Sequence, residues 1–270
     1  MRNTIIASIS KRGGGLDSAG GLFHALGLSH YWKFNTIPAF TLAEVLITLG
    51  IIGVVAAMTL PTLVQNHKKQ TIETRLAKFY STINQAIAQS EVENGSRMYW
   101  TQMEDRNANN VVSREGITPK EWYEKYLKKY LKVLKVEDSN TIEKRFDIYF
   151  TDGSLVTFSG SGWGFYPFAK NYKKIKRENA DGTSYNDLNR ETGGRELFSF
   201  MFSPTEKDNK YLYKKGVEPY TSTSWDGTIE DLKNNPMIGC NKYASNTAAN
   251  CTKLIQLNGW KIPADYPFKL

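Results

Sequence analysis

Histidine and cysteine are scarce in this 270-residue sequence, and their scarcity excludes several kinds of active site. The three histidines are His24, His30 and His67, so none lies beyond residue 67. A histidine-based catalytic triad, a histidine-ligated zinc site and an imidazole general base therefore have no candidate in most of the chain. The sequence offers no nucleophile–base pair, metal cluster or phosphate-binding loop instead, so we do not expect an enzyme.

The two cysteines, Cys240 and Cys251, are too few for a structural zinc site, which usually takes four ligands. A disulfide between them is the favoured interpretation, and it would place this part of the chain in an oxidising compartment. Closing a loop of about 12 residues would stabilise the fold by roughly 2.5–3 kcal/mol on the chain-entropy model. The alternative is a pair of free, buried thiols in a cytosolic protein.

The chain has no strong excess of either charge, since 35 Lys and Arg face 27 Asp and Glu, for a net charge of +8. Such a charge favours solubility and weak attraction to anionic surfaces, and we predict no specific binding of nucleic acid from it. With 40% hydrophobic and 13% aromatic residues, the composition is that of a folded chain with a core.

What the sequence does have is a long apolar run, PAFTLAEVLITLGIIGVVAAMTLP, whose only charge is Glu44. A helix from Phe40 to Val64 would be long enough to cross a bilayer, which takes about 20 residues. The alternative is a core helix, although soluble helices are rarely apolar on every face. A carboxylate inside such a segment costs free energy, so we expect Glu44 to have a function and a cationic partner.

The segment AFTLAEVLITLGIIGVVAAMTLP resembles the N-terminal signature of type IV pilins and type II secretion pseudopilins. In that family a prepilin peptidase cleaves before a Phe, the new amino terminus is methylated, and a Glu at the fifth position of the mature chain is needed for assembly. The resemblance implies cleavage between Ala39 and Phe40 and an assembly role for Glu44, one helical turn from the new amine. It also implies a helix kink at Pro61. The sequence departs from the family at Ala39, where Gly is usual.

The resemblance implies a cleaved leader (1–39), a transmembrane or filament-core helix (40–64), its amphipathic continuation (65–95) and a globular pilin-like head (96–270). The expected partners are prepilin peptidase, other pilin or pseudopilin subunits, and membrane lipid. This prepilin-like structural subunit would lie in the inner membrane with its head on the extracytoplasmic side, and would then enter a type IV pilus or pseudopilus. The alternative is a non-polymerising, membrane-anchored binding protein: an adhesin, or a receptor for DNA or glycan.

An apolar stripe at helical spacing continues beyond Pro61 and predicts one helix from Phe40 to Asn94. Its members are Ile72, Leu76, Phe79, Ile83, Ile87 and Val92. Asn94-Gly95 supplies the stop, with Gly suited to the position just after a helix.

The head shows a helix followed by strands, which predicts an α+β fold with an antiparallel sheet packed on the long helix. In ITPKEWYEKYLKKYLKVLK, Thr118 and Glu121 match a capping box. The apolar face of this helix comprises Trp122, Tyr126, Tyr130 and Leu134. Its lysines could lie on an anionic surface, but we favour a solvated face over an aromatic core stripe.

Strands are expected at three further places. RFDIYFTDGSLVTFSG predicts a hairpin that turns at Asp152-Gly153 through a two-residue loop. ELFSFMFS (196–203) and KYLYKKG (210–216) predict two more strands.

The segment between the strands, 159–194, is rich in Gly, Asn and Asp and is expected to be a loop. Asp181, Asn186 and Asp187 are weak calcium candidates there, since carboxylate and amide oxygens are the ligands that Ca²⁺ prefers. Their spacing fits no defined calcium loop, and Asx-rich segments usually form turns, so we predict no cofactor. Near the C-terminus a turn at Asn258-Gly259 precedes two expected anchors, Trp260 and Ile262.

Overall fold

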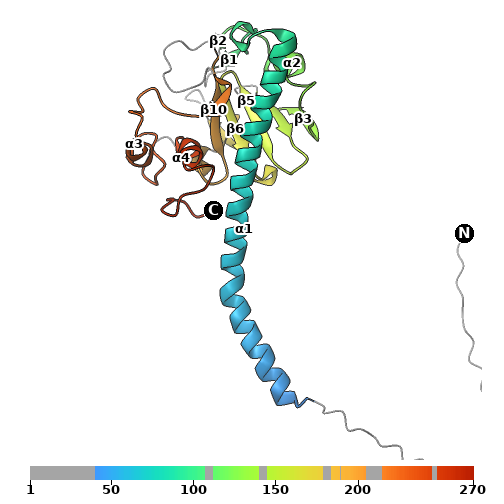
Figure 1. The fold of residues 1–270 in the computed structure, drawn as a ribbon, viewed down its shortest axis with the longest axis vertical. Helices are drawn as coiled ribbons and strands as arrows, with labels where there is room; N and C mark the ends of the chain where they lie inside the picture. Colours follow the sequence, from blue (N-terminus) through green and yellow to red (C-terminus); the bar gives the residue numbers. More distant parts are fainter. Residues whose placement is uncertain are drawn as a thin grey trace, which may run out of the picture. The chain divides into compact units, whose positions relative to one another are not determined.

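The computed structural model describes residues 40–106, 112–139, 145–178, 184–188, 190–204, 215–244 and 248–270. The chain divides into two compact units, with the boundary between Ile52 and Gly53 in the sequence. Its longest element is helix α1, Leu42–Asn94 (Figure 1). The prediction of one continuous helix is confirmed, apart from its first two residues, and Gly95 ends it with a φ of +71°.

A six-stranded antiparallel sheet forms the centre of the second unit and confirms the predicted α+β fold. Its strands lie in the order β10-β9-β6-β5-β4-β3. Their bounds are β3 Lys135–Asp138, β4 Phe146–Tyr149, β5 Leu155–Ser159, β6 Gly162–Tyr166, β9 Phe198–Phe202 and β10 Val217–Pro219.

Two small hairpins and several short helices surround this sheet. The hairpins are β1 Asp105–Arg106 with β2 Val112–Arg114, and β7 Lys174–Glu178 with β8 Ser184–Leu188. The α-helices are α2 Pro119–Tyr126, α3 Ile229–Asn234 and α4 Cys251–Leu257, and the 3₁₀ turns are η1 Arg97–Tyr99, η2 Ala169–Asn171 and η3 Arg190–Thr192.

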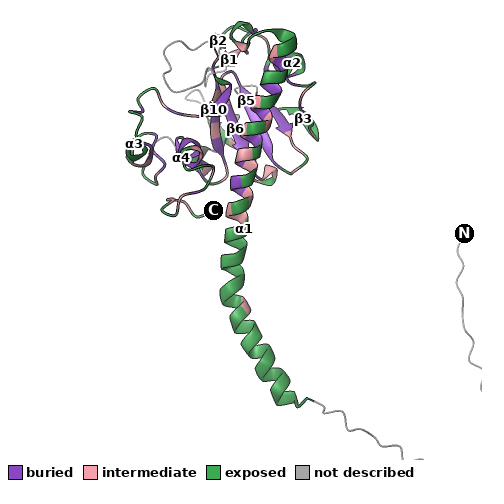
Figure 2. Cartoon of the chain, viewed as in Figure 1, coloured by how far each residue is buried: buried purple, intermediate pink, exposed green. Residues whose placement is uncertain are grey.

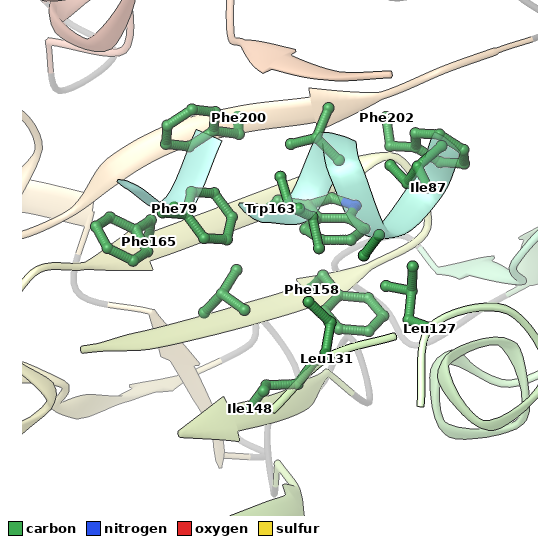
Figure 3. Packing of buried hydrophobic residues seen from close by; sticks show 14 of the residues in the cluster. Phe79, Ile87, Leu127, Leu131, Ile148, Phe158, Trp163, Phe165, Phe200 and Phe202 are labelled. Atoms are coloured by element: carbon green, nitrogen blue, oxygen red, sulfur yellow. The ribbon is translucent and has the colours of Figure 1, made fainter. Parts of the chain in front are cut away.

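The core lies between the sheet and the part of α1 that crosses β5 and β6 in Figure 1. Phe79 of α1 stacks on Phe165 of β6, with ring centroids 4.4 Å apart, and meets Phe200 of β9 edge-on at 5.0 Å (Figure 3). Rows of inward-facing aromatics from adjacent strands thus receive the helix stripe. Five predicted stripe members are buried, namely Ile72, Leu76, Phe79, Ile83 and Ile87. Val92 was wrongly included, since it is 86% exposed and follows Ser90, the last buried residue of α1.

Helix α2 begins as predicted and ends earlier than its pattern suggests. The Thr118–Glu121 capping box is present, Pro119 is the first helical residue, and Trp122 is buried while the lysines face solvent. The helix stops at Tyr126, and Leu134, expected on the apolar face, is exposed. A turn follows the helix, and the N–H of Leu134 donates to the Tyr149 carbonyl at 2.8 Å, so pairing with the sheet and not the helical pattern sets the position of Leu134.

The predicted hairpin is confirmed as β4–β5, although its loop is longer than two residues. Phe150 N–H donates to the Ser154 carbonyl, which leaves Thr151, Asp152 and Gly153 as the connection. Gly153 has a φ of +81°, which suits the last position of a three-residue loop. The strand predicted at 196–203 is confirmed as β9, whereas the one at 210–216 lies mostly outside the described residues.

The segment 159–194 was wrongly expected to be a loop. It contains β6, which joins β5 to β9 in the centre of the sheet, as well as β7 and β8. Gly162 and Gly164 made this strand resemble a loop in the sequence. They alternate along it with Trp163 and Phe165, which belong to the core that includes the α1 stripe. The buried Arg145 donates to the Gly162 carbonyl at 3.0 Å on this strand.

Candidate functional site

The front part of α1 is an apolar surface that no other described part of the chain buries. From Phe40 to Val64 every residue except the half-buried Ala56 is exposed, as the green lower part of α1 shows in Figure 2. The large apolar side chains involved are Phe40, Leu42, Val45, Leu46, Ile47, Leu49, Ile51, Ile52, Val54, Val55, Met58, Leu60, Leu63 and Val64. Soluble monomers rarely expose contiguous apolar surface of this kind, which marks a site for lipid or protein.

Glu44, the one charge in this segment, belongs to a local capping box. The backbone N–H and the hydroxyl of Thr41 each donate to Glu44 Oε2 at 2.9 Å, and the N–H of Glu44 donates to the Thr41 hydroxyl at 3.2 Å. These bonds satisfy donors that a helix start leaves without partners. The second carboxylate oxygen, Oε1, has no hydrogen bond within the described part of the chain. The sequence carries this signal as Thr-x-x-Glu, a capping box that was not among the sequence-based predictions.

Two further hydroxyls of the apolar segment, those of Thr48 and Thr59, are also satisfied within the helix. Thr48 donates to the Val45 carbonyl and Thr59 to the Val55 carbonyl, both at 3.0 Å. In hydrocarbon, a polar group without such a partner would cost several kcal/mol. The segment can therefore enter an apolar environment with few polar groups left without a partner.

Pro61 lies inside α1, which continues on both sides of it. Proline has no N–H to donate to the carbonyl four residues earlier, that of Ala57, so the helix lacks one bond there. By length and composition α1 is apolar enough to cross a membrane, a test that a signal sequence would also pass.

The remaining site residues are placed as follows. Cys240 and Cys251 form the predicted disulfide. Ala39 and Asp181 lie outside the described residues. Asn186 and Asp187 lie in strand β8, paired with β7, and not in the expected loop. No group of three or more His, Cys, Asp or Glu among the described residues could hold a metal.

A buried glutamate fixes the C-terminal segment to the packed part of α1. Glu73, 5% exposed, accepts the backbone N–H of Ile262 at 2.9 Å and pairs with Lys261 Nζ at 3.0 Å. Ile262 is buried and Trp260 packs beside Tyr80 at 5.0 Å between ring centroids, so both predicted anchors are confirmed.

A second buried carboxylate ties three elements of this unit together. Glu218 of β10, 3% exposed, accepts from the Tyr80 hydroxyl of α1 at 2.7 Å and from Gln256 Nε2 of α4 at 3.1 Å. Burial, followed by the bond to Glu218, raises the pKa of Tyr80 well above its usual value. Lys253 of α4 donates to Gln256 at 2.6 Å, and burial lowers its pKa. The network holds the disulfide-bonded region against the sheet.

Comparison with known proteins identifies a family but no activity. Residues 62–270 match DUF6613, a family of unknown function, and the chain belongs to it. No curated protein and no solved structure matches the chain. The match begins one residue after Pro61, so the apolar segment with Glu44 lies before it.

Proposed function

We propose that this chain is a prepilin-like structural subunit that is inserted in the inner membrane, cleaved by a prepilin peptidase and assembled into a type IV pilus or a type II secretion pseudopilus. The observation that carries the proposal is the exposed apolar front of α1, with Glu44 as its only charge. A long helix with an apolar front part and a rear part packed on an antiparallel sheet is also the arrangement that the resemblance to pilins implies.

The hydrogen bonds of Glu44 are compatible with two simultaneous tasks. Oε2 caps the helix through Thr41, while Oε1 has no partner within the described part of the chain. Cleavage before Phe40 would create a cationic amine, and Oε1 could accept an N–H from that amine or from the amine of a neighbouring subunit. In a low-dielectric filament core such a pair would select the register between apolar helices that otherwise pack with little specificity.

The exposed apolar surface of α1 also allows the helices of neighbouring subunits to pack together. In lipid the apolar side chains are already solvated, so moving α1 into a bundle of neighbouring helices costs little apolar free energy. In water the same surface would cause aggregation. The subunit therefore needs either a membrane or a filament around residues 40–64, and the head would lie on the extracytoplasmic side, where the Cys240–Cys251 disulfide persists.

The test is the intact mass and N-terminal sequence of the protein produced with and without an active prepilin peptidase. We expect a chain that begins at Phe40 and carries one added methyl group on its amine. A control substrate of the same peptidase must be cleaved in the same cells. If the control is cut and this chain keeps its leader, the filament proposal is wrong and a membrane-anchored binding protein takes its place.

A further inference from the structure

A hollow of about 490 Å³ lies on the second unit beside the disulfide, and three cationic side chains line it. The volume is within the range of small-molecule binding sites. Its charged and aromatic lining comes from η3, the turn before β9, the turn after α3 and the C-terminal segment, and comprises Glu191, Arg195, Lys242, Lys269 and Phe268. The apolar front of α1 contributes nothing to it, so the assembly proposal leaves this feature unexplained.

Arg195 is held in place before any ligand arrives. Its backbone N–H donates to the Thr192 carbonyl at 3.0 Å and its Nη2 donates to the Glu191 carbonyl at 2.9 Å. Its guanidinium carbon lies 5.8 Å from the centroid of the Phe268 ring. Within the described part of the chain no carboxylate pairs with Arg195. A positioned guanidinium with several N–H donors left is suited to bidentate binding of a carboxylate.

The frame behind Arg195 is rigid. Gly194 has a φ of +72°, and a Cβ at this position would lie 2.7 Å from Cys251 Sγ and 3.1 Å from the Phe268 ring. The Tyr266 hydroxyl donates to the Gly194 carbonyl. The backbone of the Arg195 turn is therefore packed directly on the disulfide and on the residue that supplies the aromatic wall.

The turn that carries Lys242 is fixed in the same way. The amide nitrogen of Asn241 donates to the carbonyls of Lys233 and Asn235, at 2.8 and 3.1 Å, and its oxygen accepts the N–H of Tyr243 at 2.9 Å. Lys242 and Lys269 are exposed. Two rigid turns thus present cations toward one hollow from positions almost fifty residues apart in the sequence.

We propose that this hollow binds an acidic saccharide, meaning a sugar ring that carries a carboxylate. Arg195 would bind the carboxylate through two N–H donors, with Lys242 and Lys269 adding charge. The Phe268 ring offers an apolar face to the C–H side of a sugar. Glu191, the acid of the hollow, would accept hydrogen bonds from the hydroxyl groups of the sugar.

The experiment is calorimetric titration of the full-length chain, in a polyoxyethylene detergent without sugar or charged groups, with tri-galacturonic acid and with its methyl ester. We expect saturable binding of the acid, with a Kd of millimolar or tighter, and at least about tenfold weaker binding of the ester. Arg195→Gln should weaken acid binding about tenfold or more, and so should the double variant Lys242→Gln/Lys269→Gln, which alters only exposed side chains. The matched control is Lys170→Gln, an exposed lysine of η2 outside the hollow, and it should bind as the parent does.

Several outcomes would overturn the assignment. Absence of binding by the folded parent would do so, and so would equal binding of acid and ester, or equal affinity in the hollow variants and Lys170→Gln. Competition by inorganic phosphate at the same concentration as the saccharide would show a general anion site instead. None of these results depends on cleavage or assembly, so failure of the filament proposal and failure of this one are distinguishable.

Discussion

Two helices of this chain begin with the same hydrogen-bonded motif and then enter opposite environments. At the start of α1 and at the start of α2, a threonine N–H and hydroxyl each donate to a glutamate at 2.9 Å, and the glutamate N–H donates back at 3.2 Å. After Glu121 the apolar side chains Trp122 and Tyr126 enter the core. After Glu44 they stay exposed for about twenty residues.

A capping box and the side chains that follow it have separate effects on a helix. The box starts a helix wherever it stands, because it satisfies the N–H groups of the first turn. The side chains that follow determine the environment in which the helix is stable. Glu121 lies among solvated lysines and has only its local task, whereas Glu44 is the only charge in 25 residues. For assembly, the charge of Glu44 should therefore matter far more than its hydrogen bonds in the capping box.

The largest expected effect is on assembly, in the variant Glu44→Gln. Glutamine also serves in capping boxes, so this change keeps the cap and removes the charge. We expect loss of filaments from cells that carry the assembly machinery, with unchanged amounts of the protein in the membrane. The measurement is the quantity of sheared filaments by immunoblot. Glu121→Gln is the matched control and should assemble normally; filaments of Glu44→Gln in parental amounts would remove the charge from the mechanism.

The next largest effect is on the stability of the second unit, in the variant Trp122→Ala. Trp122 is 1% exposed and meets the rings of Phe202 and Trp163 at 5.3 and 6.1 Å between centroids. We expect a loss of about 3–5 kcal/mol in the free energy of unfolding, as for other buried aromatics. Urea unfolding followed by circular dichroism in non-ionic detergent measures it. Leu46→Ala, at an exposed position of α1, should change this free energy by less than about 0.5 kcal/mol. Equal losses in both variants would show that the two helix segments do not differ as described.

The sequence predicted those parts of the fold that local periodicity determines. The 3.6-residue period gave α1 with its buried stripe, the Thr118 box gave the start of α2, and alternation gave β4 and β5. Where tertiary pairing outweighs the local pattern, the prediction failed. Leu134 fits the face of α2, yet the helix ends at Tyr126 and the N–H of Leu134 donates to the Tyr149 carbonyl, next to the pairing of β3 with β4. Strand β6 was missed because its glycines resemble a loop, while its pairing with two neighbours is not local.

Among the candidate sites, too, local features could be predicted from the sequence, whereas features that depend on tertiary structure could not. Glu44 stood out from the sequence because a lone charge in an apolar run is visible without a structure. Its cap is equally visible in the sequence as Thr-x-x-Glu, because a capping box is a local pattern. The hollow could not be foreseen, since Arg195 and Lys242 meet only after β9, α3 and the disulfide have brought their turns together.

A smaller effect is expected from removing the hydroxyl of each box. Thr118→Ala leaves two bonds of the α2 cap unmade, and we expect a loss of about 1 kcal/mol in the free energy of unfolding. Thr41→Ala removes the same bonds from an exposed helix start that belongs to the first unit, and the free energy of unfolding of the second unit should not change. Both are measured by the same urea titration. A loss in Thr41→Ala as large as that in Thr118→Ala would contradict the difference between the two helix starts.

The smallest effect concerns pH and isolates the charge of the α2 box. The backbone N–H of Thr118, and then its hydroxyl, lower the pKa of Glu121 below its usual value. A carboxyl whose pKa is lowered by folding stabilises the fold above its unfolded pKa, and that contribution disappears as the pH falls through the folded pKa. Glu121→Gln keeps the acceptor and does not titrate. The stability difference between the parent and Glu121→Gln should therefore be largest near pH 7 and become smaller toward the acid end of a series of urea titrations from pH 7 to about pH 3. A difference that stays constant across the series would mean that the ionised carboxylate gains nothing from the cap, and that both boxes act through hydrogen-bond geometry alone.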